Sequence, residues 1–332
     1  MNVLVTGGAG YVGSHACSAL RAAGYAPVTY DNLSRGFRAL ARFGPFEQGD
    51  ILDAPRLLEV FERYRPVAVM HFAALAYVGE SVEKPLEYYR NNFDGALSLI
   101  TAMRRSGVDK LVFSSTCAIY GTPDGMPIVE TCPQSPINPY GRSKLMVEQA
   151  LQGASAAHGL RSVSLRYFNA CGAHPSGEIG ELHRPETHLI PRVLMAASGE
   201  IDAIDIFGAD YPTADGTAVR DYIHVCDLAN AHVAALHYLE AGGETTALNL
   251  GTGRGYSVRE ILDSAGRVTG RAPASRFAGR RAGDPPMLVA DATAANRVLN
   301  FTPEWTEIDR IVASAWAWHR SPARRDIVAT NS

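Results

Sequence analysis

The chain has 332 residues, a length that corresponds to one large domain or two domains of ordinary size. Its 31 Lys and Arg residues nearly balance 34 Asp and Glu residues, and the net charge of −3 excludes a global basic field for nucleic acid or an anionic membrane. Five cysteines without CxxC spacing favour a reducing compartment over a disulfide framework. The N-terminus lacks a basic leader and no apolar stretch is long enough to span a bilayer, so we expect a cytoplasmic protein with neither a nucleic-acid nor a membrane partner.

Short apolar runs alternate with helical patterns over the first half of the chain. We expect strands at 3–5, 27–31, 46–51, 67–74, 110–115 and 162–167. We expect helices at 12–23, 56–64, 85–105 and 139–158. Apolar strands separated by helices indicate a parallel sheet covered on both faces, so the predicted fold class is α/β with a doubly wound, Rossmann-type sheet.

The alternation breaks after about residue 169. Segments 172–186 and 208–216 are rich in Gly, Pro, Asp and His, which indicates loops. Mixed elements follow, with strands expected at 203–207 and 248–251 and helices at 225–240, 257–269 and 308–319. We therefore expect a first domain over 1–169 and a smaller, mixed α/β domain over 170–332, some segments of which return to the first. The second domain should bind the substrate, because long ordered loops are usually binding loops.

A glycine-rich segment, Thr6–Gly13, follows the first predicted strand and opens the first predicted helix. Gly7 permits a tight turn, Gly10 lets the backbone approach a pyrophosphate, and Gly13 allows close packing of the helix. The helix N-terminus then offers free N–H groups and a positive dipole end to phosphates. The segment predicts a dinucleotide-binding site.

Acidic residues at the ends of the next strands refine this prediction. Asp31 ends the second predicted strand, where a carboxylate binds the adenosine ribose and repels a 2′-phosphate, which favours NAD over NADP. Arg35 and Arg38 nearby leave NADP open. Asp50 could contact the adenine, although a turn cap explains it better when it is taken alone. The small residues at 72–74 would let the cofactor lie close to the sheet, and strand packing explains them nearly as well.

Tyr140 and Lys144 lie one turn apart at the start of a predicted helix. An ammonium about 4–5 Å from a phenolate stabilises it by roughly 3–4 kcal/mol, so we expect Lys144 to lower the pKa of Tyr140 and make it a base near neutral pH. Thr116, at the end of the preceding strand, is the expected third member and would orient the reacting oxygen. Cys117 is interpreted as a packing residue, because no base is specified for it.

Longer motifs extend over nearly the whole chain. They are TGGAGYVGSH, KPLEYYRNN, SSTCAIYG, NPYGRSKLMVE, RYFNACGAHP, DYPTADGTAVRDYIHVCDLA, NLGTG and RRAGD. Together they resemble the UDP-glucose 4-epimerase family, a branch of the extended short-chain dehydrogenase/reductases. The resemblance implies an isomerase with a tightly held NAD that is not consumed. In that scheme Tyr140 takes the proton of the sugar 4-hydroxyl while carbon 4 gives a hydride to the nicotinamide. The 4-keto sugar then rotates and takes the hydride back on its other face.

The resemblance also assigns site residues. The expected cofactor residues are Gly7, Gly10, Tyr11, Val12, Gly13, Asp31, Asn32, Asp50, Ile51, Phe72, Ala73, Ala74, Asn91, Ser114, Tyr140, Lys144 and Tyr167. The expected UDP-sugar residues are Thr116, Tyr140, Asn169, His188, Leu189, Arg220, Tyr222, Arg281, Asp284 and Leu288. Arg220 and Arg281 suit a diphosphate, because a guanidinium is a planar fork.

Several departures leave the substrate range open. Leu288 stands where some relatives have a tyrosine, and the smaller leucine could admit an N-acetyl group. Ala76 stands where some relatives have a lysine near the cofactor. Epimerisation of UDP-pentoses or UDP-N-acetylhexosamines is the first alternative. A nucleotide-sugar dehydratase is disfavoured because Cys117 and Ala118 follow Thr116, and a catalytically silent NAD-sensing module is disfavoured because the Tyr/Lys pair is intact. The resemblance implies a homodimer, and we expect no metal because the histidines show no close ligand cluster.

Overall fold

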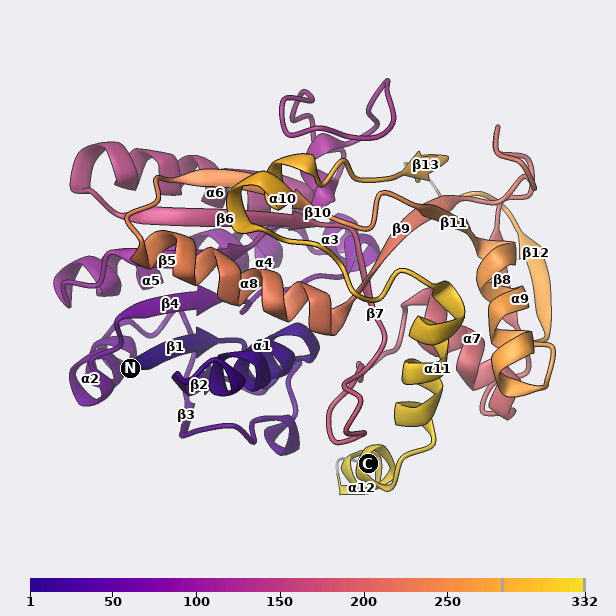
Figure 1. Cartoon of the computed structure of the whole chain (residues 1–332), viewed down its shortest axis with the longest axis horizontal. Coiled ribbons are helices and arrows are strands. Elements are labelled where there is room, and N and C mark those ends of the chain that lie inside the picture. The colour runs from indigo at the N-terminus through magenta and orange to yellow at the C-terminus, as the bar shows by residue number, and fades with distance from the viewer. Residues whose placement is uncertain (282–283, 331–332) are drawn as a thin grey trace.

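The computed structural model describes residues 1–281 and 284–330. A seven-stranded sheet with the order β3-β2-β1-β4-β5-β6-β10 forms its centre (Figure 1). All of its strand pairs are parallel. The strands are β1 (Asn2–Thr6), β2 (Ala26–Asp31), β3 (Phe46–Gln48), β4 (Ala68–His71), β5 (Lys110–Ser114), β6 (Arg161–Tyr167) and β10 (Thr246–Leu250).

Both faces of the sheet are buried, because successive side chains of each strand enter different cores. Val3 and Val5 pack in one hydrophobic cluster with α1, α8 and α10, whereas Leu4 packs in the other with α2, α5 and α6. The helices of the first face are α1 (Tyr11–Ala22), α8 (Val225–Glu240) and α10 (Thr293–Leu299). Those of the second face are α2 (Ala54–Tyr64), α5 (Gly95–Arg105) and α6 (Pro139–His158). The predicted doubly wound fold is confirmed.

The strand order reverses direction between β1 and β4, and this point positions the site. From β1 the chain proceeds outward to β2 and β3, and it then returns to β4 on the other side of β1. In a parallel sheet of this type the loops at the carboxyl ends of these two strands separate and leave a crevice for a ligand. The glycine-rich segment follows β1 directly and therefore borders this crevice.

Apart from α8, β10 and α10, the elements that follow β6 form a second region beside the carboxyl ends of the large sheet (Figure 1). Its small sheet has the order β11-β9-β13, with β7 paired to β9, and β12 pairs β8 in a separate ribbon. The strands are β7 (Asn169–Cys171), β8 (Ile204–Phe207), β9 (Val219–His224), β11 (Gly255–Ser257), β12 (Ser275–Ala278) and β13 (Met287–Leu288). The helices are α7 (Leu189–Ser198), α9 (Val258–Thr269), α11 (Ile308–His319) and α12 (Pro322–Thr330). No helix in the described part of the chain is long and apolar enough to cross a membrane.

The helix expected at 85–105 is interrupted. The chain forms α3 (Val78–Glu83), α4 (Pro85–Tyr88), a π-helical turn η2 (Tyr89–Asp94) and then α5. Asn92 in the π turn is buried and its amide donates to the Leu75 carbonyl and the Ser143 hydroxyl. A π turn contains one residue more than an α-helical turn, and these hydrogen bonds stabilise it. The hydrophobic periodicity of the sequence does not show such an insertion. Short 3₁₀ turns complete the first half at η1 (Arg38–Leu40) and η3 (Cys117–Tyr120).

The sequence did not predict β9, which lies at the centre of the small sheet. Arg220 and Asp221 interrupt its apolar pattern, and Asp221 is fully buried. The Asp221 carboxylate accepts hydrogen bonds from backbone N–H groups of Thr252, Gly253 and Ala290. A buried carboxylate that is satisfied by three distant N–H groups gives no local signal. Helices α7, α10 and α12 were also not predicted.

Candidate active site

A cavity of about 460 Å³ lies where the loops of the large sheet meet the small sheet. It is bounded by side chains from both regions of the chain. The predicted residues that line it are Gly7, Gly10, Tyr11, Val12, Gly13, Asp31, Asn32, Ile51, Phe72, Ala73, Ala74, Asn91, Ser114, Thr116, Tyr140, Lys144, Tyr167, Asn169, His188, Leu189, Arg220, Tyr222, Asp284 and Leu288.

Two predicted residues are not among those that line the described cavity. The Asp50 carboxylate accepts a 2.8 Å hydrogen bond from the amide of Asn32, which does line it. The Arg281 guanidinium lies over the ring of Phe207, with its central carbon 4.0 Å from the ring centre. Residues 282–283 of the RRAGD motif lie outside the described residues. Cofactor contact by Asp50 and substrate contact by Arg281 stay predictions.

The glycine-rich turn has the backbone that a dinucleotide cradle requires. Gly7 has φ +75°, and a Cβ there would lie 2.5 Å from the amide nitrogen of Ala73. A Cβ on Gly13 would lie 2.2 Å from the carbonyl oxygen of Gly7. Gly10 is the N-cap of α1 and provides no side-chain cap, so the first N–H groups of that helix remain available for an anion. The segment therefore fits the pyrophosphate of NAD.

Asp31 connects this turn to the end of β2. Its carboxylate accepts hydrogen bonds from the backbone N–H groups of Ala9, at 3.0 Å, and Leu33, at 2.8 Å. Burial raises the pKa of Asp31, and the two N–H donors oppose that rise. The carboxylate is thus fixed at the cavity wall by the loop that it orders, where it can accept hydrogen bonds from ribose hydroxyls.

Helix α6 and strand β5 bring the predicted catalytic residues together. Asn138 caps α6 by accepting a hydrogen bond from the Gly141 N–H, which fixes the helix start and therefore Tyr140. Thr116 and Tyr140 both line the cavity, and the Thr116 hydroxyl acts to lower the pKa of Tyr140. The Lys144 ammonium donates a 2.8 Å hydrogen bond to the Ser114 carbonyl and lies 6.0 Å from the centre of the Tyr140 ring.

The electrostatics of this group differ from the expectation. Burial raises the pKa of Tyr140, and the neighbouring Tyr167 raises it further, while the Thr116 hydroxyl opposes the rise. Burial lowers the pKa of Lys144 to about 7, although the charge of Glu148 counteracts it. The expected lowering of the pKa of Tyr140 by Lys144 is therefore wrong for the protein alone. The reason is that removal from water penalises the charged forms of both side chains.

A buried ion pair behind Lys144 was missed in the sequence. Glu148 follows Lys144 by one helical turn, and its carboxylate pairs with Arg166 at 2.6 Å. Both partners are buried, and the Ser115 hydroxyl also donates to Glu148. A glutamate four residues after the lysine of the motif was the available signal, because i and i+4 share a helix face.

The small sheet explains how distant substrate residues meet. Asn169 in β7 is the register partner of Tyr222 in β9, and Leu288 in β13 is the register partner of Arg220 in β9. Strand pairing thus aligns four predicted residues on one wall of the cavity. The Arg220 guanidinium also forms an ion pair with Asp284 at 2.5 Å, which orients it there.

Comparisons with known proteins agree with this arrangement. The model of the NAD dependent epimerase/dehydratase family matches residues 3–251. The chain belongs to this family. It is 53% identical to a UDP-glucose 4-epimerase of Rhizobium meliloti (strain 1021), over 96% of this chain and 97% of that protein.

Solved structures of relatives have the same fold. The UDP-glucose 4-epimerase of Brucella ovis in complex with NAD is 54% identical, with a TM-score of 0.93 over 95% of this chain and 98% of the other. The enzyme of Stenotrophomonas maltophila, with bound NAD and formylated UDP-arabinopyranose, is 42% identical, with a TM-score of 0.93 over 98% and 99% of the two chains. Membership of the family confirms the predicted resemblance.

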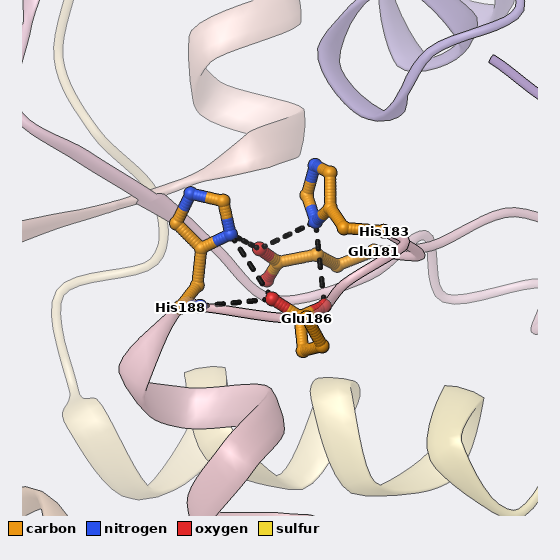
Figure 2. Close-up of side chains that lie close together, drawn as sticks. All are labelled: Glu181, His183, Glu186 and His188. Atoms are coloured by element: carbon orange, nitrogen blue, oxygen red, sulfur yellow. Dashed lines mark hydrogen bonds and ion pairs between the residues drawn. The ribbon is translucent and has the colours of Figure 1, made fainter. Parts of the chain in front are cut away.

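Four polar residues next to the cavity form a cluster that the sequence analysis did not find. Glu181, His183, Glu186 and His188 point toward one another in the loop between β7 and α7 (Figure 2). The expectation that no histidines cluster with possible metal ligands is therefore wrong. The alternation of Glu and His within eight residues was the available signal, but a loop has no periodicity that shows where its side chains converge.

Protonation of this cluster is strongly coupled. Burial disfavours the charged form of His188, but hydrogen bonds and charge from Glu181 and Glu186 raise the pKa of His188 to about 10. Burial raises the pKa of Glu181, whereas Glu186, despite its own burial, has its pKa lowered to about 2 by His183 and His188. The two carboxylates thus favour the protonated, positively charged form of the His188 ring.

Proposed function

We propose that the chain is a UDP-glucose 4-epimerase that keeps NAD bound throughout the reaction. The observation that carries this proposal is that a dinucleotide cradle, the Thr116–Tyr140–Lys144 group and the wall of the small sheet all face one cavity. The family membership and the names of the relatives support the same activity. The cavity is concave and lined by both apolar and polar groups, as small-molecule sites usually are.

NAD, when bound, supplies a hydride acceptor for carbon 4 of the sugar and a positive charge near Tyr140. Residues of the chain itself remove and return the proton of the sugar 4-hydroxyl. The Asn138 cap fixes the start of α6 and so the position of Tyr140, whose phenolic oxygen takes the proton of the sugar 4-hydroxyl, while the Thr116 hydroxyl favours the phenolate form. The same oxygen returns that proton after the keto sugar has rotated, so Tyr140 acts first as the base and then as the acid.

The substrate's diphosphate requires cationic groups on the other wall of the cavity. Arg220 offers a planar donor fork there, and Asp284 fixes its direction. Asn169 and Tyr222 lie beside it through the pairing of β7 and β9. We infer that this wall holds the UDP part while Tyr140 and Thr116 face the sugar.

The substrate range beyond glucose is a further proposal. Leu288 lines the cavity, and because a leucine side chain is smaller than that of tyrosine, it leaves more room for the sugar. A relative with 42% identity was solved with a UDP-pentose derivative. We propose that UDP-pentoses and UDP-N-acetylhexosamines compete as substrates with UDP-glucose.

The structure disfavours the two other functions, a dehydratase and a silent NAD-sensing module. A dehydratase needs acid–base groups directly after Thr116, but Ala118 has none, and burial raises the pKa of the Cys117 thiol to about 12. A silent NAD-sensing module has no use for a Tyr/Lys pair in the cavity, whereas here both residues line it.

We also propose that the protein is a cytoplasmic homodimer. Val82, Leu86 and Leu97 on α3, α4 and α5 are 64%, 79% and 38% exposed, and apolar surface of this kind is typical of a protein–protein interface. These helices pack beside α6, so a second copy could complete a four-helix interface. All five cysteines are free thiols, which is typical of a reducing compartment.

The test of the main proposal uses purified protein and UDP-glucose without added NAD. UDP-galactose should form until both sugars reach equilibrium, and the Tyr140→Phe variant should be about 10²–10⁴-fold slower. A wild-type protein that forms no UDP-galactose, or a variant as fast as the wild type, would contradict the proposal. Parallel assays with UDP-xylose and UDP-N-acetylglucosamine measure the substrate range.

A further inference from the structure

The loop between β7 and α7 carries four potential metal ligands in eight residues. Glu181, His183, Glu186 and His188 each offer one ligand atom, and these four atoms all lie within 4.8 Å of one another. Figure 2 shows the two imidazole rings and two carboxylates converging on a common point. Three of them also line the cavity, so the loop that carries the cluster forms part of its wall.

Four nitrogen–oxygen distances within the cluster are close to those of a tetrahedral coordination shell. The His188 Nδ1 atom lies 3.1 Å from a carboxylate oxygen of Glu181 and 3.1 Å from one of Glu186. The His183 Nδ1 atom lies 3.5 Å and 3.3 Å from oxygens of the same two carboxylates. Ligands bound to Zn²⁺ at about 2.0–2.2 Å in a tetrahedron are separated by about 3.3–3.6 Å. Each ring nitrogen thus faces both carboxylates, and the two oxygens of Glu186 are divided between the two rings.

Hydrogen bonds alone satisfy this geometry poorly. An imidazole Nδ1 atom carries at most one proton, so each ring has a single N–H donor at most for the two carboxylates that it faces. In the described part of the chain neither Glu181 nor Glu186 pairs with Arg or Lys. A divalent cation would balance the charge of the two carboxylates and accept a lone pair from each neutral imidazole. Glu181 is buried, where an uncompensated charge is costly.

Backbone groups also hold one ligand in place from outside the cluster. The Glu186 carboxylate accepts hydrogen bonds from the N–H groups of Thr187, at 2.8 Å, and His188, at 2.9 Å. Bonds of this kind orient the carboxylates of metal sites. His188 is the N-cap of α7, so a metal ion there would connect the loop to the start of that helix.

We propose that Glu181, His183, Glu186 and His188 bind a structural divalent cation of the Zn²⁺ type. Two imidazole nitrogens and two carboxylate oxygens are borderline and hard ligands that suit Zn²⁺ in four-coordinate geometry. Since the protein fills all four positions, the ion has no open site for substrate. Its role is to brace the cavity wall beside His188 and Leu189.

The test measures metal content, so it is independent of the epimerase reaction. Untagged, NAD-containing protein is treated with a chelator, reloaded with Zn²⁺, passed through a desalting column and analysed for zinc. We expect about one Zn²⁺ per chain in the wild type and less than about a tenth in His183→Ala. The matched control is His237→Ala, which removes an exposed histidine of α8 and should keep the full zinc content.

Co²⁺ provides a second measurement that needs no variant. Bound at this site it should give the intense visible absorption of tetrahedral Co²⁺, and Zn²⁺ should displace that signal. The proposal is overturned if the reloaded wild type retains no zinc, if His183→Ala retains as much as the wild type, or if Co²⁺ shows only the weak spectrum of six-coordinate ions. Those results would mean that the four side chains share protons rather than a metal.

Discussion

The ammonium of Lys144 donates a 2.8 Å hydrogen bond to the carbonyl of Ser114, which ties the catalytic helix to the end of the strand that carries Thr116. Ser114 in turn exchanges a 2.7 Å hydrogen bond with the hydroxyl of Tyr167. A single turn of α6 and the end of β5 therefore set the position of the whole catalytic group. Ser114, Thr116 and Lys144 are buried, so a charge on Lys144 is costly.

The first prediction concerns the charge of Lys144 and stability. The pKa of Lys144 is about 7 in the folded protein and near 10.4 in an unfolded chain, so between these values the unfolded state binds more protons. Stability should therefore rise with pH across this window, and the burial penalty is complete below about pH 7. Lys144→Met removes it, so near pH 6 the cofactor-free variant should be about 2–4 kcal/mol more stable than the wild type.

Denaturant unfolding of the two proteins at several pH values measures this difference. It should shrink as the pH rises toward 10 and the wild-type lysine becomes neutral in both states. A difference that is constant with pH would contradict the assigned pKa of Lys144.

The second prediction concerns Thr116. Its hydroxyl lines the cavity and opposes the rise in the pKa of Tyr140, so Thr116→Val should lower kcat by about tenfold or more while the bound NAD content is unchanged. Thr116→Ser keeps the hydroxyl and should retain most of the activity. Steady-state kinetics and the absorbance of released cofactor check both variants. If the serine and valine variants lose activity equally, the hydroxyl is not the group that matters.

The third prediction separates two acidic residues near the cofactor. Asp31→Asn removes a charged acceptor from the cavity wall, so NAD should bind about ten- to a hundredfold more weakly. Asp50→Asn should change NAD binding much less, because Asp50 faces Asn32 and does not line the described cavity. Isothermal titration of the stripped proteins with NAD gives both values. The reverse ranking would show that Asp50 contacts the cofactor.

The fourth prediction concerns the size of the sugar. Leu288→Tyr places a larger ring against the cavity, so turnover of UDP-N-acetylglucosamine should fall at least about tenfold relative to that of UDP-glucose. The matched control is Met287→Tyr, because Met287 precedes Leu288 in β13 and does not line the described cavity. If the ratio of UDP-N-acetylglucosamine to UDP-glucose turnover is the same in the wild type and both variants, Leu288 does not determine specificity.

The fifth prediction concerns the oligomer. Leu86 is 79% exposed on α4, so Leu86→Arg should turn a dimer into a monomer by placing charges in the interface. Phe277→Arg, at an exposed apolar residue of β12, is the control and should leave the dimer intact. Light scattering coupled to gel filtration measures both masses. A monomeric wild type would contradict the proposed homodimer.

The local parts of the site could be predicted from the sequence. The glycine turn and the Tyr140/Lys144 pair each lie within one strand–helix junction, so their spacing alone determines their geometry. The order of strands and helices in the large sheet followed from its periodicity for the same reason.

The substrate wall could not be derived in this way. Asn169, Arg220 and Leu288 meet only because β7, β9 and β13 pair across long stretches of chain, and the family resemblance was needed to assign them. Burial at the catalytic group could not be predicted from the sequence either. The pKa of Tyr140 was expected to follow from the charge of Lys144 alone. It is in fact governed by their removal from water, which depends on the whole fold.

The central claim is that the chain epimerises its substrate at carbon 4 with a resident NAD. The most direct measurement uses UDP-glucose that carries deuterium at carbon 4, with no added NAD and with the product analysed by mass spectrometry. The account predicts UDP-galactose that retains the deuterium, because the hydrogen never leaves the closed cavity. Loss of the label to water, or a reaction that proceeds only with added NAD, would contradict it.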